Sequence, residues 1–143
     1  MPRPTARRWG GKDFYVWKST DLVTWERSER PFLTLDGANG NVPWATGNAW
    51  APTIIERDGK YWFYFSGHNP TYDRKTIGVA VADSPEGPFT AQPTAMITNG
   101  EAVTSGQAID PAAFRDRRPG STGSCGATAG RRTARSWRSW TTT

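Results

Sequence analysis

The 143-residue chain has very little of two residue types on which many small domains depend, cysteine and histidine. Its single cysteine, Cys125, excludes an intramolecular disulfide, and its single histidine, His68, excludes a histidine-rich metal site. Long apolar runs are also missing, which together with a mean hydropathy of −0.68 argues against a membrane span. The first residues lack the apolar core of a secretory signal peptide, so we expect none in this chain and leave its location open.

Positive charge is concentrated at one end of the sequence. The formal net charge of +5 would by itself favour a nucleic-acid partner. However, residues 1–110 hold 11 Lys and Arg against 12 Asp and Glu, whereas residues 111–143 hold seven Arg and one Asp. From Arg115 onward there is no Val, Ile, Leu, Met, Phe or Tyr, so this stretch cannot offset the entropy of ordering a chain. We predict a folded region over residues 1–116 and a disordered, basic, low-complexity tail over 117–143.

The folded region has the patterns of β-strands. Aromatic and β-branched residues gather at 14–17, 53–56, 60–66 and 76–81, and no stretch keeps a helical period over three turns. Asp58-Gly59 separates two of these runs, which predicts a tight β-hairpin. The aromatic run within 60–66 is expected to pack on both faces of a sheet. The sequence therefore predicts an all-β fold.

A weak internal repeat runs through the folded region. The segment 18–25 is echoed by 83–89, with the serines 65 residues apart. Ala51-Pro52 is echoed by Asp110-Pro111, with the prolines 59 residues apart. A period near 60 with several strands in each unit is typical of β-propeller blades, and chance similarity within an aromatic β-protein is the alternative.

These segments resemble glycoside hydrolase family 43, and the resemblance covers residues 11–116. Four motifs carry it, in the family's order: Ser19-Thr20-Asp21-Leu22-Val23-Thr24-Trp25; Trp50-Ala51-Pro52 leading into Asp58-Gly59-Lys60-Tyr61-Trp62; Ile77-Gly78-Val79-Ala80 leading into Ser84-Pro85-Glu86-Gly87-Pro88-Phe89; and Ile109-Asp110-Pro111 with Phe114 and Asp116. The resemblance implies a fragment, about two blades, of a five-bladed β-propeller. It also implies hydrolysis of arabinofuranosyl or xylosyl linkages, with an arabinose- or xylose-containing poly- or oligosaccharide as partner. We expect no metal or other cofactor and no membrane partner.

The chemistry implied by the resemblance is inverting glycoside hydrolysis. One carboxylate acts as base on a water, a carboxylic acid protonates the leaving oxygen, and a third carboxylate tunes the pKa of the acid. Asp110 matches the tuning position. The family's base and acid lie in segments that no residue of this chain matches, so we expect the chain to be inactive. Without the resemblance, Asp110 would be a turn or helix-capping aspartate before proline.

Four further residues are candidates for contacting a sugar. Trp50 could stack on the apolar face of a sugar ring, or it could be a buried blade residue. Asn48 and Gln107 lie beside the two proline-containing segments and could hydrogen-bond sugar hydroxyls or serve in turns. His68 follows a strand and could line the site or lie in a surface loop.

Three interpretations stay open, two for the basic tail and one for the folded region. The family pattern stops after Asp116, and regrouped codons permit propeller-like sequence there, so one hypothesis is a reading frame disrupted near this residue. A second is nucleic-acid binding by the arginines, with Trp137 and Trp140 stacking on bases. We do not expect a nucleic-acid partner outside the tail. A third places the function in the folded region, as a non-catalytic carbohydrate-binding fragment.

Overall fold

The computed structural model describes residues 10–98, 107–115 and 125–126, and these form β-strands and one short 3-10 helix. In chain order the elements are β1 (Asp13–Phe14), β2 (Trp17–Lys18), β3 (Glu26–Arg27), β4 (Leu33–Thr34), η1 (Gly37–Asn39), β5 (Trp50–Arg57), β6 (Lys60–Asn69), β7 (Arg74–Ala82), β8 (Thr90–Ala91), β9 (Phe114–Arg115) and β10 (Cys125–Gly126). Within these residues there is no helix of the length and hydropathy that a bilayer crossing requires.

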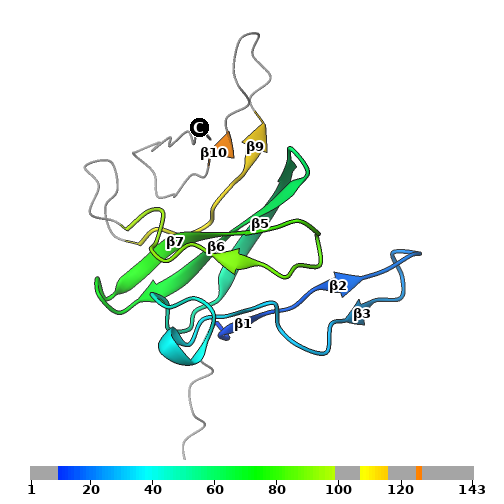
Figure 1. The fold of residues 1–143 in the computed structure, drawn as a ribbon. Helices are drawn as coiled ribbons and strands as arrows, with labels where there is room; N and C mark the ends of the chain where they lie inside the picture. Colours follow the sequence, from blue (N-terminus) through cyan, green and yellow to red (C-terminus); the bar gives the residue numbers. More distant parts are fainter. Residues whose placement is uncertain (1–9, 99–106, 116–124, 127–143) are drawn as a thin grey trace, which may run out of the picture.

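The central feature is an antiparallel four-stranded sheet with the order β5-β6-β7-β8 (Figure 1). Between β5 and β6, Asp58 and Gly59 have φ values of 54° and 74°. Two consecutive residues with positive φ are what a two-residue hairpin turn requires. The predicted hairpin is confirmed, and a sheet of four antiparallel strands joined in chain order has the arrangement of one propeller blade.

Two short ribbons precede this sheet, in which β1 pairs with β4 and β2 pairs with β3. The sequence predicted one strand over 14–17, whereas the structure has two strands of two residues each. Ser28 accounts for the interruption, because its Oγ accepts a hydrogen bond from the Val16 N–H at 3.3 Å. The Ser28 N–H donates to the Val16 carbonyl at 2.9 Å, so the chains stay paired around an irregular position.

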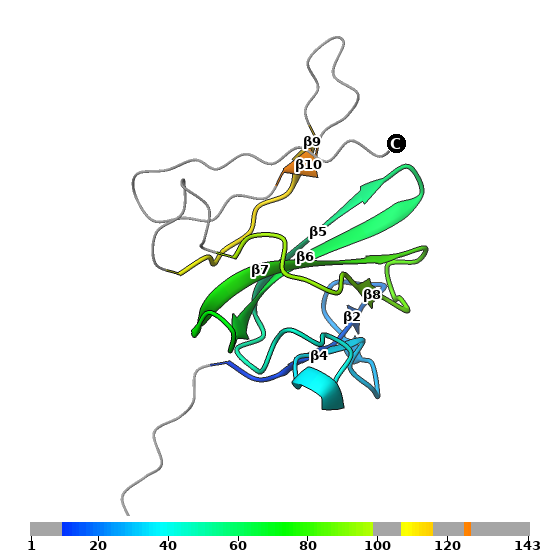
Figure 2. The same cartoon turned by 60° about the vertical axis from the view of Figure 1, so that its left-hand side comes forward.

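Both faces of the four-stranded sheet are covered. Phe63 and Phe65 of β6 pack in one core cluster with residues from β1, β4 and the loop around Val42. Tyr64, between them, packs in a second cluster that contains Met96 and Ile97. Figure 2 shows β4 and η1 on one side of the sheet and the segment that leads to β9 on the other. The prediction that the aromatic run packs on both faces is confirmed.

Gly78 of β7 is required by the packing of the first cluster. The rings of Trp44 and Phe65 stack with centroids 5.8 Å apart and an interplanar angle of 12°. A Cβ atom at position 78 would lie 2.3 Å from Cζ2 of Trp44 and 2.7 Å from Cζ of Phe65. The glycine therefore leaves the space that the stacked pair fills.

The internal repeat is visible in the backbone. The Asp21 N–H bonds to Ser19 Oγ at 3.3 Å, and the Glu86 N–H bonds to Ser84 Oγ at 3.3 Å, so both serine segments begin with the same turn. In the second pair of repeated segments, the residues before proline, Ala51 and Asp110, have φ values of 44° and 58°. Positive φ is uncommon in residues other than glycine, so its recurrence supports a structural repeat over a chance similarity.

The predicted tail is described at two residues, Cys125 and Gly126, which form β10 and pair with β9. This short pairing is more structure than the sequence predicts for that stretch. The rest of the tail, including Trp137 and Trp140, lies outside the described residues.

Candidate functional site

The candidate residues are arranged around one end of the four-stranded sheet. In the pairing of the strands, Trp50 is opposite Ser66, and His68 is opposite Lys75. The start of β5, the end of β6 and the start of β7 therefore lie together. Asn48, two residues before β5, and Gln107, which contacts β7, extend the group on either side.

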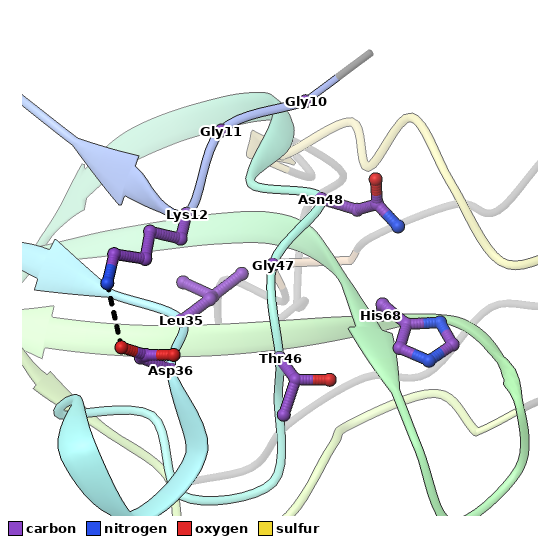
Figure 3. A pocket seen from close by; sticks show the side chains of 9 residues that line it. All are labelled: Gly10, Gly11, Lys12, Leu35, Asp36, Thr46, Gly47, Asn48 and His68. Carbon is purple, nitrogen blue, oxygen red and sulfur yellow. Dashed lines mark hydrogen bonds and ion pairs between the residues drawn. The ribbon is translucent and has the colours of Figure 1, made fainter. Parts of the chain in front are cut away.

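Asn48 and His68 line one pocket with a volume of about 730 Å³ (Figure 3). Its remaining lining residues come from three segments: Gly10, Gly11, Lys12, Leu35, Asp36, Thr46 and Gly47. Asn48 and His68 stand on one side of the pocket, and the ion pair between Lys12 and Asp36 stands on the other. The structure thus brings together two of the predicted site residues.

Hydrogen bonds fix the wall of this pocket. The Thr46 N–H donates to the His68 carbonyl at 2.8 Å, and the His68 N–H donates to the Gly47 carbonyl at 3.0 Å. The Gly47 N–H donates to the Leu35 carbonyl at 2.6 Å. The loop that carries Asn48 is therefore bonded to β6 on one side and to Leu35, the residue after β4, on the other.

A close backbone approach explains the glycine at the pocket's rim. Gly10 has a φ of 98°, and a Cβ atom there would lie 3.0 Å from the Cα of Asn48. Asn48 itself has a φ of 52°, a conformation that asparagine adopts more readily than most residues. Any side chain at position 10 would displace Asn48.

The charged groups at the pocket are paired. Lys12 Nζ lies 2.7 Å from Asp36 Oδ2, and this hydrogen bond raises the pKa of Lys12 above its usual value. Nε2 of His68 lies 3.8 Å from Oδ1 of Asp73, an ion pair only when the imidazole is protonated. Both pairs are exposed at one partner or both, so we expect a small contribution to stability from each.

Trp50 is a surface residue of the sheet's end. Its side chain is 42% exposed, and Nζ of Lys75 lies 4.1 Å from the centroid of its ring. The β5-β6 register shifts between Trp50 and Thr53, where Ala51 has its positive φ. A bulge at this point re-aims the indole relative to the regular strand that follows.

Asp110 projects from an anchored segment. The Ala108 N–H donates to the Lys75 carbonyl at 3.1 Å, and Oε1 of Gln107 accepts from the Lys75 N–H at 2.7 Å. Ala108 and Pro111 are buried, whereas Asp110 between them is exposed. The carboxylate is therefore presented outward by a segment that is fixed on both sides.

No pattern in the sequence singled out Lys75, although this residue contacts both Trp50 and Gln107. From the sequence alone, a lysine at the start of a strand is expected to face solvent. Its neighbours follow from the pairing of His68 with Lys75, and although Asn69-Pro70 marks a turn there, it does not specify this register.

No metal centre is found in the part of the chain that the structure describes. Three or more His, Cys, Asp or Glu side chains do not come together there as ligands for an ion. The arrangement instead combines an exposed indole, amide and imidazole groups, and a carboxylate. Such a set suits an uncharged, hydroxyl-rich ligand with one apolar face.

Comparisons with known proteins agree with this geometry. The model of glycosyl hydrolases family 43 matches residues 5–122. Xylosidase/arabinosidase 43A of Humicola insolens is 42% identical over 79 residues, which are 53% of this chain and 21% of that protein. A xylosidase/arabinosidase of Bacteroides ovatus is 31% identical over 108 residues, which are 73% of this chain and 29% of that protein.

Solved structures show the same similarity. A GH43_1 enzyme of Xanthomonas citri, in complex with xylose, is 31% identical with a TM-score of 0.60, over 79% of this chain and 31% of that one. A β-xylosidase/α-arabinofuranosidase from a compost metagenome, in complex with xylotriose, is 30% identical with a TM-score of 0.59, over 76% and 29%. The chain thus spans about a fifth to a third of the length of these relatives, and the expected fold, an all-β propeller fragment, is confirmed.

Proposed function

Because this chain belongs to glycosyl hydrolases family 43, we propose that it is part of an inverting hydrolase of xylosyl or arabinofuranosyl linkages in plant polysaccharides. The names of the relatives, xylosidase/arabinosidase, support this substrate class, as do the related structures that contain xylose and xylotriose. The observation on this chain that carries the proposal is the gathering of Trp50, Gln107 and the pocket of Asn48 and His68 at one end of the sheet.

Each side chain in this group has a role that fits a pentose ligand. The exposed indole of Trp50 offers a flat apolar surface on which the C–H groups of a sugar ring stack. Asn48 and His68 present hydrogen-bonding groups to a pocket whose volume is within the usual range for small-molecule sites. The amide nitrogen of Gln107 is not used in its bond to Lys75 and supports a contact with a hydroxyl.

Asp110 takes the role of the pKa-tuning carboxylate. A negative charge near a second carboxyl group disfavours ionisation of that group, which keeps a general acid protonated at neutral pH. Its exposed position on an anchored segment supports this role. Tuning needs an acid to act on, and no residue of this chain matches the family's base or acid. We therefore propose that the 143-residue chain, taken by itself, binds substrate without hydrolysing it.

Sugar binding tests the proposal directly. Titration of the purified 143-residue chain with xylotriose and with arabinotriose, followed by calorimetry or NMR, should detect weak binding of at least one. Trp50→Ala should weaken it about tenfold, because a lost aromatic platform is worth about 1–2 kcal/mol. Trp17→Ala is the matched control, since Trp17 is 57% exposed on β2. A folded chain that binds neither sugar, or equal losses in both variants, would contradict the proposal.

An activity assay tests the absence of turnover. The chain should release no nitrophenol from nitrophenyl xylosides or arabinofuranosides. Turnover that disappears in Asp110→Asn would show that Asp110 works with a base and acid in this chain. A dedicated carbohydrate-binding fragment would also bind sugar without turnover. The half-exposed Trp50 is the observation that favours this second function.

We also propose that native family sequence ends near Asp116, a few residues before the family match ends at 122, and that residues 117–143 are not native family sequence. The support is compositional, since the arginine-rich tail lacks aliphatic residues. Resequencing the gene tests this, because a frame disruption predicts that propeller sequence continues in a shifted frame. A filter-binding titration tests the alternative, in which nucleic-acid affinity falls steeply with salt.

A further inference from the structure

Lys75 contacts both halves of the candidate site. Its Nζ lies 4.1 Å from the ring centroid of Trp50. Its main-chain N–H and carbonyl bond to Gln107 Oε1 at 2.7 Å and to the Ala108 N–H at 3.1 Å. One residue therefore touches the indole through its side chain and the segment before Asp110 through its backbone.

The side chain reaches Trp50 by crossing a strand. β6 lies between β5 and β7 in the sheet, so the strands that carry the two residues are two strand spacings apart, about 10 Å. Ser66 is opposite Trp50 on one side and opposite Ile77 on the other, and Lys75 precedes Ile77 by two residues. Side chains alternate along a strand, so Trp50, Ser66 and Lys75 share one face.

The residue at the crossing point is small and polar. Ser66 is fully buried, and among the described residues its Oγ has no hydrogen-bond partner. The small side chain opposite Trp50 leaves space beside the indole, and Trp50, Ser66 and Lys75 lie on three neighbouring strands at the end of the sheet where the site residues gather.

From these contacts we propose that Lys75 is a positioning residue of the site, an inference that rests on the proposed carbohydrate function. Its ammonium covers one face of the Trp50 indole, fixes the orientation of the ring and leaves the other face for a sugar. Its backbone fixes the Gln107–Ala108 segment and thereby the start of the loop that presents Asp110. Lys75 couples the aromatic platform to the carboxylate-bearing segment without touching the reacting bond.

The test separates the charge from the backbone contacts. Lys75→Met keeps an unbranched side chain and the main-chain bonds but removes the cation, and Lys75→Arg restores a cation. Lys60→Met is the control, since Lys60 pairs with Asp83 at the opposite end of the sheet. The first readout is the xylotriose dissociation constant. The second is the emission of Trp50, obtained as the difference between spectra with and without Trp50→Phe.

We expect Lys75→Met to weaken xylotriose binding about 2- to 5-fold, the worth of one exposed cation–π contact. It should also shift the Trp50 emission while leaving the thermal midpoint near that of the parent. Lys75→Arg should restore both readouts, and Lys60→Met should change neither. Unchanged binding and emission in Lys75→Met, or a failure of Lys75→Arg to rescue, would overturn the inference.

Failure of the proposed function has a different signature. If the parent chain does not bind xylotriose, the carbohydrate proposal fails, and the emission readout then decides whether Lys75 orients the indole. An emission shift in Lys75→Met with rescue by Lys75→Arg supports the orienting contact. An unchanged emission rejects it.

Discussion

The chain has two units, β1 to β4 and β5 to β8, each of which contains one of the two repeated serine segments, and they differ in how far their apolar side chains are buried. In the first, β1 to β4 are two residues long, and four large apolar side chains are exposed: Trp17 at 57%, Leu22 at 77%, Val23 at 82% and Trp25 at 49%. In the second, β5, β6 and β7 are eight to ten residues long, and Phe65 and Ile77 are fully buried. Phe14 and Leu33 of the first unit are buried in the same cluster as Phe65, so the difference between the units lies in β2 and the turn up to Trp25 and not in β1 and β4.

The difference shows what makes a blade stable. The first repeated segment ends at the half-exposed Trp25, whereas the second ends at Phe89, which is 6% exposed. Phe89 packs on Phe32 and Phe63 with ring centroids 4.9 and 5.7 Å away. A sheet buries its apolar side chains only where another layer lies against that face. The strands of the second unit are therefore long where such a layer covers them.

Among the changes that test this comparison, we expect truncation of a core side chain in the second unit to lower the free energy of unfolding most. Phe65→Ala should cost about 3–5 kcal/mol in the free energy of unfolding, because it removes a fully buried ring that packs against Phe14 and Trp44. Trp25→Ala should cost less than about 1 kcal/mol, as for an exposed residue. Urea denaturation followed by circular dichroism measures both. Similar losses for the two variants would show that Trp25 is as tightly packed in solution as Phe65 is.

Adding volume to the second unit should have the next largest effect. Gly78→Ala places a Cβ atom against the stacked rings of Trp44 and Phe65, which should cost about 1–3 kcal/mol by overpacking. The control is Gly11→Ala, since a Cβ atom at position 11 comes no closer than 3.9 Å to the Asp13 nitrogen. Equal midpoints in thermal denaturation for the two variants would contradict the tight packing assigned to Trp44.

The second unit was also the part that the sequence predicted best. Its hairpin follows from Asp58-Gly59, and the strands over 53–56, 60–66 and 76–81 appear as parts of β5, β6 and β7. Local patterns suffice there because the turn chemistry and the aromatic run agree. The run at 14–17 was predicted less well, since the side chain of Ser28, 12 residues from Val16, interrupts its pairing.

For the candidate site, the sequence predicted which residues take part but not which residues they contact in the fold. The repeated motifs were enough to identify four candidate residues in or beside them: Asn48, Trp50, Gln107 and Asp110. The contact of Lys75 with Trp50 depends on the register of β5, β6 and β7 together, and a shift of one residue would turn Lys75 to the other face. Contacts of this kind are determined by the pairing of distant strands, so no short stretch of sequence predicts them.

The smallest effect concerns a carboxylate that stabilises the first unit alone. Asp21 Oδ1 accepts hydrogen bonds from the N–H groups of Thr24 and Val23 at 2.8 and 2.9 Å. These bonds, with a further one from Ser19, lower the pKa of Asp21 from an ordinary 3.8 to about 2. In the turn of the second unit, Glu86 takes the position of Asp21, and its carboxylate accepts a hydrogen bond from Lys18 Nζ at 3.0 Å.

The sign of the pH dependence follows from that lowered pKa. Folding favours the ionised form of Asp21, so its stabilisation is complete above pH 3.8 and is lost as the pH falls toward 2. The thermal midpoint of Asp21→Asn should therefore lie slightly below that of the parent at pH 6, and the gap should close by pH 2. Asp83→Asn, which removes an exposed carboxylate paired with Lys60, is the matched change in the second unit. The amide proton shifts of Val23 and Thr24 should titrate near pH 2 in the parent and in Asp83→Asn, but not in Asp21→Asn. If these amides titrate near pH 4 instead, the turn of the first unit is open in solution, and the contrast between the two units is larger than the structure shows.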